Sequence, residues 1–338
     1  MKKKLILGLL ILITVFSTCL IFAENQASIA VTGMVKQPLT LAMEDLARFQ
    51  TVKVQLNEVM KDGTFRGVFY YQGVTLRNLL DTAIIEKKDK SFSKHIDMAI
   101  KIRNREGKEV VLSWGEIYYR NSGDIIVATS AAPIMPHKSC ASCHESSFYK
   151  PYMDQLSRGI EFPKLVVGSD GYSDRCLEGI VSIEVIDPPQ NKGVTGDSSA
   201  ELSTPSFKIT GIVKNEMTVT DVSKYQDKEM EVIFVGEGKG FHGIRDYSGA
   251  SLYALLDDAG IDYDLTTAIQ VSAPDGYRSL FSYGEIFLNR DKESIFVADI
   301  EDGKAIKEGG KFFLIPTDDI MADRDVKSIK EIQVFKID

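Results

Sequence analysis

Two cysteines and a histidine stand close together at residues 140–144 of this chain. The segment reads Cys140-Ala-Ser-Cys143-His144, and the whole sequence of 338 residues holds only four cysteines and four histidines. Two thiols at this spacing can form thioether bonds to the two vinyl groups on one edge of a porphyrin, and a histidine directly after them can bind its iron. The motif therefore predicts covalently bound haem c, with Cys140 and Cys143 as the thioethers and His144 as the proximal iron ligand.

The same residues could serve three other purposes. A zinc site made of Cys140, Cys143, Cys176 and a histidine would need a second closely spaced pair of ligands, which the sequence lacks. A redox disulfide between Cys140 and Cys143 would need a strand-to-helix setting that this segment does not show. The cysteines could also be structural, with the spacing a coincidence. Haem attachment is favoured because it also agrees with export of the chain, for which the N-terminus gives separate evidence.

The second axial ligand of the iron would come from one of two nearby side chains. His137 lies just before the motif and Met153 follows it. We expect Pro151 to break the chain and let Met153 fold back over the ring, with a packing role for Met153 as the alternative. A thioether ligand would raise the reduction potential and an imidazole would lower it. Of the other histidines, His95 is expected in solvent, and His242 at the surface or in a local hydrogen bond.

The N-terminus has the pattern of an export signal. Lysines at positions 2–4 precede an apolar run over residues 5–16, and Ala23 ends the segment before polar sequence begins. This pattern predicts a signal peptide over residues 1–23, cleaved after Ala23, and the lack of an Arg-Arg pair indicates the general, Sec-type route. The protein would then be periplasmic or otherwise exported. An uncleaved membrane anchor is the alternative, and only in that case would the protein contact a membrane.

The composition limits the classes of partner. The sequence is 44% hydrophobic and 26% charged, which allows a normal core. Its net charge is −8, and the loss of three lysines with residues 1–23 makes it −11. An acidic surface without a basic stripe repels phosphate backbones, so nucleic acid is not an expected partner. The same field favours redox protein partners that present basic faces.

The sequence contains two copies of a whole domain. Four stretches of the first part return in the same order in the second part: 31–50 with 209–226, 65–83 with 241–259, 114–130 with 283–299, and 173–187 with 322–336. A repeat of this length is a duplicated domain rather than a solenoid unit. The predicted organisation is domain 1 over 24–187, a linker rich in proline, glycine and serine over 188–206, and domain 2 over 207–338.

Each copy mixes strands and helices. Alternating apolar residues predict strands over 53–59, 124–130 and 180–186. Apolar residues at i, i+3, i+4 and i+7 predict a core helix that follows Thr75 as its N-cap, and the same pattern returns behind Ser251.

The order of these motifs resembles that of a known family. The fragments "FRGV" and "GVTLRNLL", then "GEI" and "IVA", and a closing "IVSIEV" are similar to the molybdopterin-binding domain of the sulfite oxidase family. The resemblance covers nearly all of both copies. It implies an α+β fold made of two tandem sulfite-oxidase-like mixed α/β domains, with a strongly twisted sheet.

The resemblance also implies a molybdenum cofactor with one cysteine thiolate as metal ligand, ahead of the "GVxLxxLL" helix. The matching stretches, 52–65 and 230–241, contain no cysteine, and Cys176 lies at another position, where we expect a buried small residue or a free thiol. Family members that carry the cofactor also tend to leave the cytoplasm folded, through the twin-arginine route, whose signal is missing here. Molybdopterin is therefore not expected, because a similar fold does not by itself imply the same cofactor.

The haem motif lies in an insertion that only the first copy carries. Ala128 and Asp174 are 46 positions apart, whereas the matching Ala298 and Asp323 are 25 apart, so the first copy is 21 residues longer here. The insertion spans about 131–162. A long insertion in one of two sister domains is a place where function is often added.

The sequence as a whole thus predicts an exported monohaem c-type cytochrome that transfers electrons, on a duplicated sulfite-oxidase-like scaffold without molybdenum. Two alternatives stay open. One is a molybdopterin-dependent oxidoreductase with its own haem relay, and the other is a haem-based ligand sensor. The protein is more readily explained as an electron carrier than as an enzyme.

Overall fold

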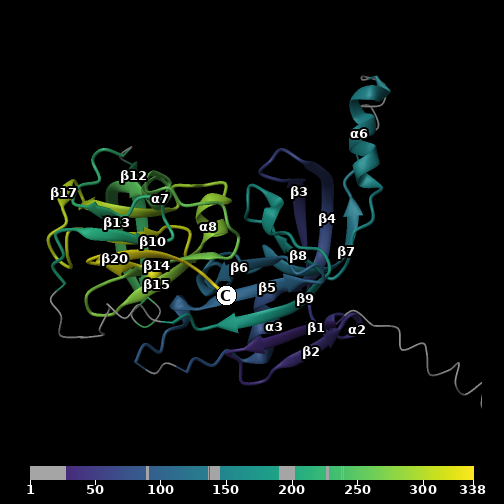
Figure 1. Cartoon of the computed structure of the whole chain (residues 1–338), viewed down its shortest axis with the longest axis horizontal. Helices are drawn as coiled ribbons and strands as arrows, with labels where there is room; N and C mark the ends of the chain where they lie inside the picture. The colour runs from purple at the N-terminus through teal and green to yellow at the C-terminus, as the bar shows by residue number, and fades with distance from the viewer. Residues whose placement is uncertain are drawn as a thin grey trace, which may run out of the picture.

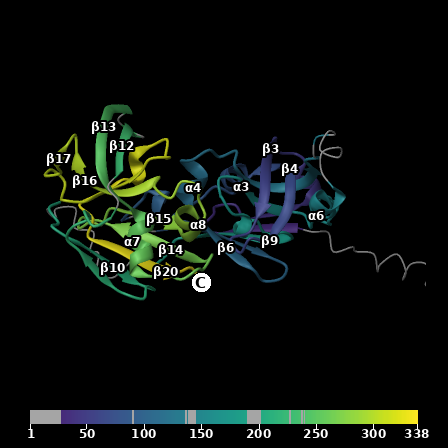
Figure 2. The same cartoon turned by 90° about the horizontal axis from the view of Figure 1, so that it is seen from above.

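Two similar sets of β-sheets, one from each half of the chain, form the computed structural model of this protein (Figure 1). The structure describes residues 28–88, 91–135, 137, 145–189, 202–225, 228–236, 238 and 240–338. The two halves lie side by side in both views (Figures 1 and 2). Within these residues, no helix combines the length and apolar character that a membrane crossing requires. The predicted signal peptide lies outside them.

The first half contains a five-stranded sheet in the order β2-β1-β9-β5-β6 and a four-stranded sheet in the order β3-β4-β7-β8. Its strands are β1 (Ser28–Gly33), β2 (Leu39–Ala42), β3 (Thr51–Val59), β4 (Phe65–Thr75), β5 (Ala99–Asn104), β6 (Glu109–Ser113), β7 (Ile125–Pro133), β8 (Lys164–Val167) and β9 (Ile180–Ile186). Its helices are α2 (Met43–Leu46), α3 (Leu76–Ala83), α4 (Trp114–Tyr118) and α6 (Ser146–Leu156), with short 3₁₀ turns η1 (His95–Asp97) and η2 (Ser173–Arg175).

The second half repeats this plan. Its sheets have the orders β11-β10-β20-β14-β15 and β12-β13-β16-β18-β19, and β17 pairs with β16. Its strands are β10 (Phe207–Gly211), β11 (Met217–Val219), β12 (Lys228–Gly236), β13 (Gly240–Ser251), β14 (Thr267–Ser272), β15 (Arg278–Ser282), β16 (Ile295–Glu301), β17 (Lys304–Ala305), β18 (Phe313–Pro316), β19 (Val326–Lys327) and β20 (Glu331–Lys336). Its helical elements are α7 (Leu252–Ala259), α8 (Tyr283–Phe287) and η3 (Ala322–Arg324).

The five-stranded sheets of the two halves match strand by strand, whereas the other sheet of the second half has two strands, β17 and β19, beyond the four of the first half. In each half the first strand runs parallel to the last one, β1 with β9 and β10 with β20, while the other pairings are antiparallel. The strands predicted over 53–59 and 180–186 fall within β3 and β9, and the one predicted over 124–130 begins one residue before β7. The chain is mixed and consists mostly of β-sheet with few helices, which is compatible with the expected α+β class.

Helices α3 and α7 begin where the sequence predicted. The Thr75 hydroxyl accepts a hydrogen bond from the Asn78 N–H at 3.2 Å, and the Ser251 hydroxyl accepts one from the Ala254 N–H at 3.1 Å. Each cap satisfies a backbone donor that has no partner inside the helix.

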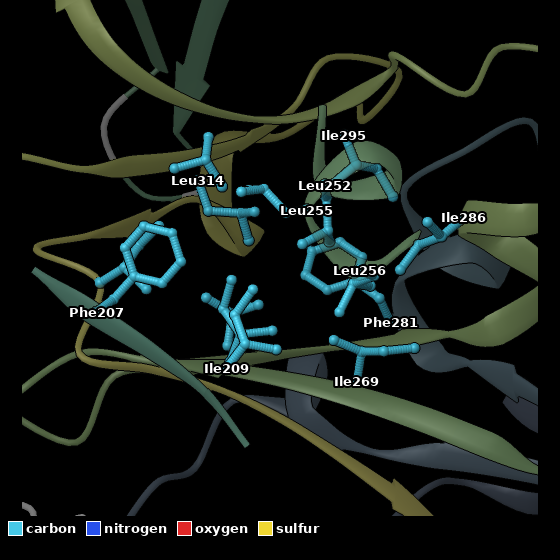
Figure 3. Close-up of a cluster of buried hydrophobic side chains, with 14 of the residues drawn as sticks. Phe207, Ile209, Leu252, Leu255, Leu256, Ile269, Phe281, Ile286, Ile295 and Leu314 are labelled. Carbon is cyan, nitrogen blue, oxygen red and sulfur yellow. The ribbon is translucent and has the colours of Figure 1, made fainter. Parts of the chain in front are cut away.

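The apolar faces of these helices are fully buried in the core of each half. Leu252, Leu255 and Leu256 of α7 meet Phe207 and Ile269 from the sheet (Figure 3). Burial of one such leucine contributes about 1.5–3 kcal/mol to the free energy of unfolding. These side chains are therefore part of the scaffold and not of a site.

Two buried arginines, Arg175 and Arg324, join the halves in the same way from opposite sides. Arg175 Nη1 donates to Ser282 Oγ of the second half at 3.0 Å, and Arg324 Nη1 donates to Ser113 Oγ of the first half at 3.2 Å. These contacts link helical turns η2 and η3 to the N-caps of α8 and α4.

Buried carboxylates compensate the charge of both guanidinium groups. Asp170 accepts from Arg175 Nε at 2.8 Å and from its Nη2 at 2.6 Å. In the second half, Asp319 accepts from Arg324 Nε at 2.6 Å, and Glu285 accepts from Arg324 Nη2 at 2.7 Å. A buried cation without such partners would be strongly destabilising, so each cluster has to be present as a unit.

Candidate functional site

The residues of the haem motif, Cys140, Cys143 and His144, lie outside the described residues. The segment that contains them is attached to the fold at both of its ends. Strand β7 ends at Pro133 before it, and helix α6 starts at Ser146 after it. Among the described residues of the second half, β16 is followed by the short strand β17 rather than by a helix like α6.

Helix α6 lies at the end of the first half that is farther from the second half (Figures 1 and 2). It packs on the first half through Tyr152, whose ring stacks on Phe65 with 5.8 Å between the ring centroids. The Tyr152 hydroxyl donates to the Ile134 carbonyl oxygen at 2.5 Å, and burial raises the pKa of this phenol. Met153 and Leu156 pack against the same apolar cluster of β3, β4 and β7. The insertion is therefore fixed to the sheet on its C-terminal side.

The expectation that Pro151 breaks the chain is wrong, because α6 continues through Pro151. A proline inside a helix removes one hydrogen bond. Here the packing of Tyr152 and Met153 on the sheet, and an ion pair between Lys150 and Asp154 with 2.6 Å between Nζ and Oδ2, hold the helix together.

Arg158, just after α6, fastens the insertion to the sheet beneath it. Its Nη2 donates to Glu58 Oε2 at 2.6 Å, and its Nη1 donates to Glu178 Oε1 at 2.7 Å. Its Nε donates to the Arg66 carbonyl oxygen at 3.0 Å. One side chain of the insertion thereby contacts β3, β4 and the loop before β9.

A buried charge cluster lies under this contact. Lys164 Nζ donates to Glu58 Oε1 at 2.6 Å, to Glu178 Oε1 at 3.2 Å and to the Tyr71 hydroxyl at 3.0 Å. The Tyr71 hydroxyl itself donates to Glu58. Burial and the charge of Glu58 raise the pKa of Tyr71 far above its usual range. Burial also acts to raise the pKa of Glu178, but the charge of Lys164 and the hydrogen bond from Arg158 outweigh it and lower that pKa.

Sequence reasoning missed this cluster. Its only signal is a charged residue at an inward-facing position of a strand, Glu58 in β3 and Lys164 in β8. Such residues are rarely buried unless they are paired. The cluster keeps Tyr71 protonated and its charges neutralised, so its role is to hold the insertion rather than to exchange protons.

The second half has an open cavity where the first half has this cluster. Strand pairing places Phe234 at the position of Glu58, Tyr247 at that of Tyr71, and Phe313 at that of Lys164. Together with Asp325 and Lys327 these residues line a cavity of about 450 Å³. Loss of the charged pair and of the insertion therefore leaves space between the sheet and η3.

The two candidates for the distal iron ligand differ in their surroundings. Met153 packs partly buried against the apolar cluster of the first half, as in the alternative packing role. His137 is exposed and lies directly before the haem segment. The remaining histidines are not near this segment in the sequence. His242 is exposed and lines the cavity of the second half.

The expectation for His95 is wrong, because its side chain is half-buried rather than in solvent. The 3₁₀ turn η1 holds the imidazole against Trp114, with 5.9 Å between the ring centroids. The lysine-rich segment before His95 led to the prediction of an exposed side chain, but the contact with the tryptophan ring partly buries it.

Cys176 is the one cysteine among the described residues, and its surroundings do not suit a metal thiolate. It is buried, and its Sγ accepts a hydrogen bond from the Val167 N–H at 3.4 Å. Burial raises the pKa of this thiol to about 12, so the thiol stays protonated. A molybdenum ion held by a soft thiolate therefore does not fit here, and no group of three or more potential metal ligands occurs within the part of the chain that the structure describes.

No family model and no curated protein matches this chain. Among solved structures, the chain is similar to the crystal structure of the sulfane dehydrogenase SoxCD from Paracoccus pantotrophus. The identity is 12%, the match covers 92% of this chain and 77% of the other, and the TM-score is 0.33. A likeness at this level assigns neither a cofactor nor an activity.

Proposed function

We propose that this protein is an exported monohaem c-type cytochrome that transfers electrons, on a duplicated scaffold of sulfite-oxidase type that lacks molybdenum. One observation carries the proposal. The C-x-x-C-H motif at 140–144 lies in an insertion that only one of two otherwise matching halves possesses. A chain that keeps its scaffold twice and adds a haem motif once has gained a separate function at that place.

Residues of this chain would hold the haem as follows. Cys140 and Cys143 would bind it covalently and His144 would ligate its iron, which supplies one-electron chemistry at that point. Helix α6 and Arg158 fix the far end of the haem segment to the first half, which limits the positions that the segment can reach. The position of α6 at the outer end of the first half leaves this side open to a redox partner (Figure 2).

His137 is the better candidate for the distal ligand. Met153 would have to leave its contacts with the apolar cluster under α6 in order to reach a haem, and this would expose apolar surface to water. His137 is exposed and lies outside this apolar cluster. Replacement of His137 with methionine should then raise the reduction potential, whereas Met153→Leu should leave the absorption spectrum of the haem unchanged.

The decisive experiment is a pyridine haemochrome assay on protein from a host that matures c-type cytochromes. We expect one covalent haem per chain, and its loss in Cys140→Ala and Cys143→Ala. Cys176→Ala is the matched control and should keep the haem, since Cys176 is outside the motif. Colourless protein with both motif thiols free to react would overturn the proposal.

Two further measurements separate the alternatives. Molybdenum at one atom per chain would support the oxidoreductase with a haem relay instead. A high-spin spectrum of the reduced protein would support the ligand sensor, because electron carriers keep both axial positions of the iron occupied.

A further inference from the structure

The cavity of the second half has an apolar wall made of three packed aromatic rings. The ring centroids of Phe234 and Tyr247 are 5.6 Å apart, those of Tyr247 and Phe313 are 5.8 Å apart, and those of Phe234 and Phe313 are 6.2 Å apart. With a volume of about 450 Å³, the cavity is in the size range of sites for small organic molecules.

Two groups of opposite charge, Asp325 and Lys327, line the same cavity. They are two residues apart in extended chain, so their side chains leave the same face of the strand roughly 7 Å apart. The backbone N–H of Asp325 donates to the Ala322 carbonyl oxygen at 3.2 Å, but its carboxyl group forms no hydrogen bond or ion pair with the other described residues. Burial and the nearby charge of Asp319 raise the pKa of Asp325 well above its usual value. A desolvated carboxyl group without a partner destabilises the protein unless a bound ligand pairs with it.

The other charged side chains around the cavity already have partners. Arg245 pairs with Glu301 across the sheet. Asp275 accepts a hydrogen bond from the Tyr277 N–H at 2.9 Å in its own turn. Lys327, in contrast, is exposed at the cavity, with its Nζ 5.5 Å from the centroid of the Phe313 ring. The groups available to a ligand are thus a half-buried carboxyl, an exposed ammonium and an aromatic wall.

The open cavity is a property of this half and not of the fold. In the first half, the ion pair of Glu58 with Lys164 takes up the equivalent positions. Cys176 and Glu178 stand there in place of Asp325 and Lys327, so the described residues of the first half do not offer this pair of groups.

We propose that this cavity binds a small zwitterion of the amino-acid type with an apolar side chain. The ligand's ammonium group would pair with the Asp325 carboxylate, its carboxylate would pair with Lys327, and its side chain would pack on Phe234, Tyr247 and Phe313. An ammonium group in this position would form a charge-assisted hydrogen bond with the carboxylate and a cation–π contact with the aromatic faces. The site does not depend on the haem segment, so its test is separate from that of the proposed function.

Calorimetric titration of the full chain with three related probes tests this proposal. L-Phenylalanine carries both charges, phenethylamine only the ammonium and 3-phenylpropionate only the carboxylate. We expect L-phenylalanine to bind most tightly, with each half-charged probe weaker on the order of tenfold or more, as for the loss of one charged hydrogen bond. No detectable binding of any probe up to millimolar concentration, or equal binding of all three, would overturn it.

Matched variants assign the two charges. Asp325→Asn should weaken L-phenylalanine and phenethylamine, and Lys327→Gln should weaken L-phenylalanine and 3-phenylpropionate. Asp318→Asn, an exposed acid in the same half and outside the cavity, is the control and should leave all three affinities unchanged. Unchanged affinity for L-phenylalanine in Asp325→Asn, with thermal unfolding as in the parent protein, would refute the assigned pairing.

Discussion

At the scale of single residues, the buried Lys164 of the first half is expected to contribute strongly to stability. Lys164→Met should lower the free energy of unfolding by about 3–5 kcal/mol, because Glu58 and Glu178 would lose a buried partner. Urea unfolding followed by circular dichroism measures this. The control is Lys150→Met, since Lys150 pairs with Asp154 on the exposed face of α6 and should cost less than about 0.5 kcal/mol. Equal losses in the two variants would contradict a structural role for the cluster.

A second residue-scale prediction concerns acid stability. Burial acts to raise the pKa of Glu285, but the charges of Arg324 and Arg120 outweigh it and lower this pKa to about 2 from the usual 4.5. A carboxyl group with a lowered pKa in the folded state contributes stability above its unfolded pKa and loses it as the pH falls through the folded value. Glu285 therefore stabilises the protein above about pH 4.5, and this contribution disappears between about pH 4.5 and 2.

Urea midpoints from pH 5 to pH 2 test this prediction. Glu285→Gln should flatten the fall in stability over this range, whereas Glu308→Gln, which alters an exposed acid of the same half, should not. If the urea midpoint of Glu285→Gln fell with pH as steeply as that of the parent protein, protonation of Glu285 would not be the cause of the loss of stability in acid.

At the scale of elements, the two helix starts at the contact between the halves have no room for a side chain. A Cβ atom at Gly115 of α4 would lie 2.2 Å from Arg324 Nε, and one at Gly284 of α8 would lie 2.2 Å from Arg175 Nε. Gly284→Ala should therefore lower stability by about 1–3 kcal/mol through overpacking. Gly159→Ala is the control, because a Cβ there meets no atom within 4 Å. Differential scanning calorimetry would show whether only Gly284→Ala lowers the melting temperature.

A further element-scale prediction concerns helix α6. Tyr152→Ala removes both the stacking on Phe65 and the hydrogen bond to Ile134, so amides in α6 should exchange hydrogen faster while those of β4 change little. Tyr152→Phe keeps the ring, so the exchange rates of its α6 amides should lie between those of the parent protein and those of the alanine variant. Uniform exchange changes across the first half would mean that α6 does not open on its own.

Local signals explain what the sequence could predict at this scale. Thr75 and Ser251 cap two helices of eight residues each, and the apolar residues of each helix recur at helical spacing within those eight residues. Both helices were therefore predictable. Pro151 was misleading because the contacts that keep α6 helical come from strands far away in the sequence. The charge cluster was not predictable either, since Glu58 and Lys164 are 106 residues apart.

At the scale of the whole molecule, the duplication was visible in the sequence, but the way in which the copies meet was not. The contact is reciprocal even in the backbone. The Tyr119 carbonyl oxygen accepts from the Ile320 N–H at 2.8 Å, and the Leu288 carbonyl oxygen accepts from the Gly171 N–H at 2.7 Å. These pairs stand at matching positions of the two copies, so each copy offers the other the same surface.

This reciprocity has a historical implication. Serine, glycine and glutamate occupy matching positions on both sides of the contact, in Ser113-Trp-Gly-Glu116 and Ser282-Tyr-Gly-Glu285. An ancestor with one such unit could have associated with itself through this surface as a symmetric homodimer. Fusion of two such units would make the association independent of protein concentration and would leave each unit free to diverge. The two units differ today in two places: the first carries the cysteine-bearing insertion, and the second has the open cavity.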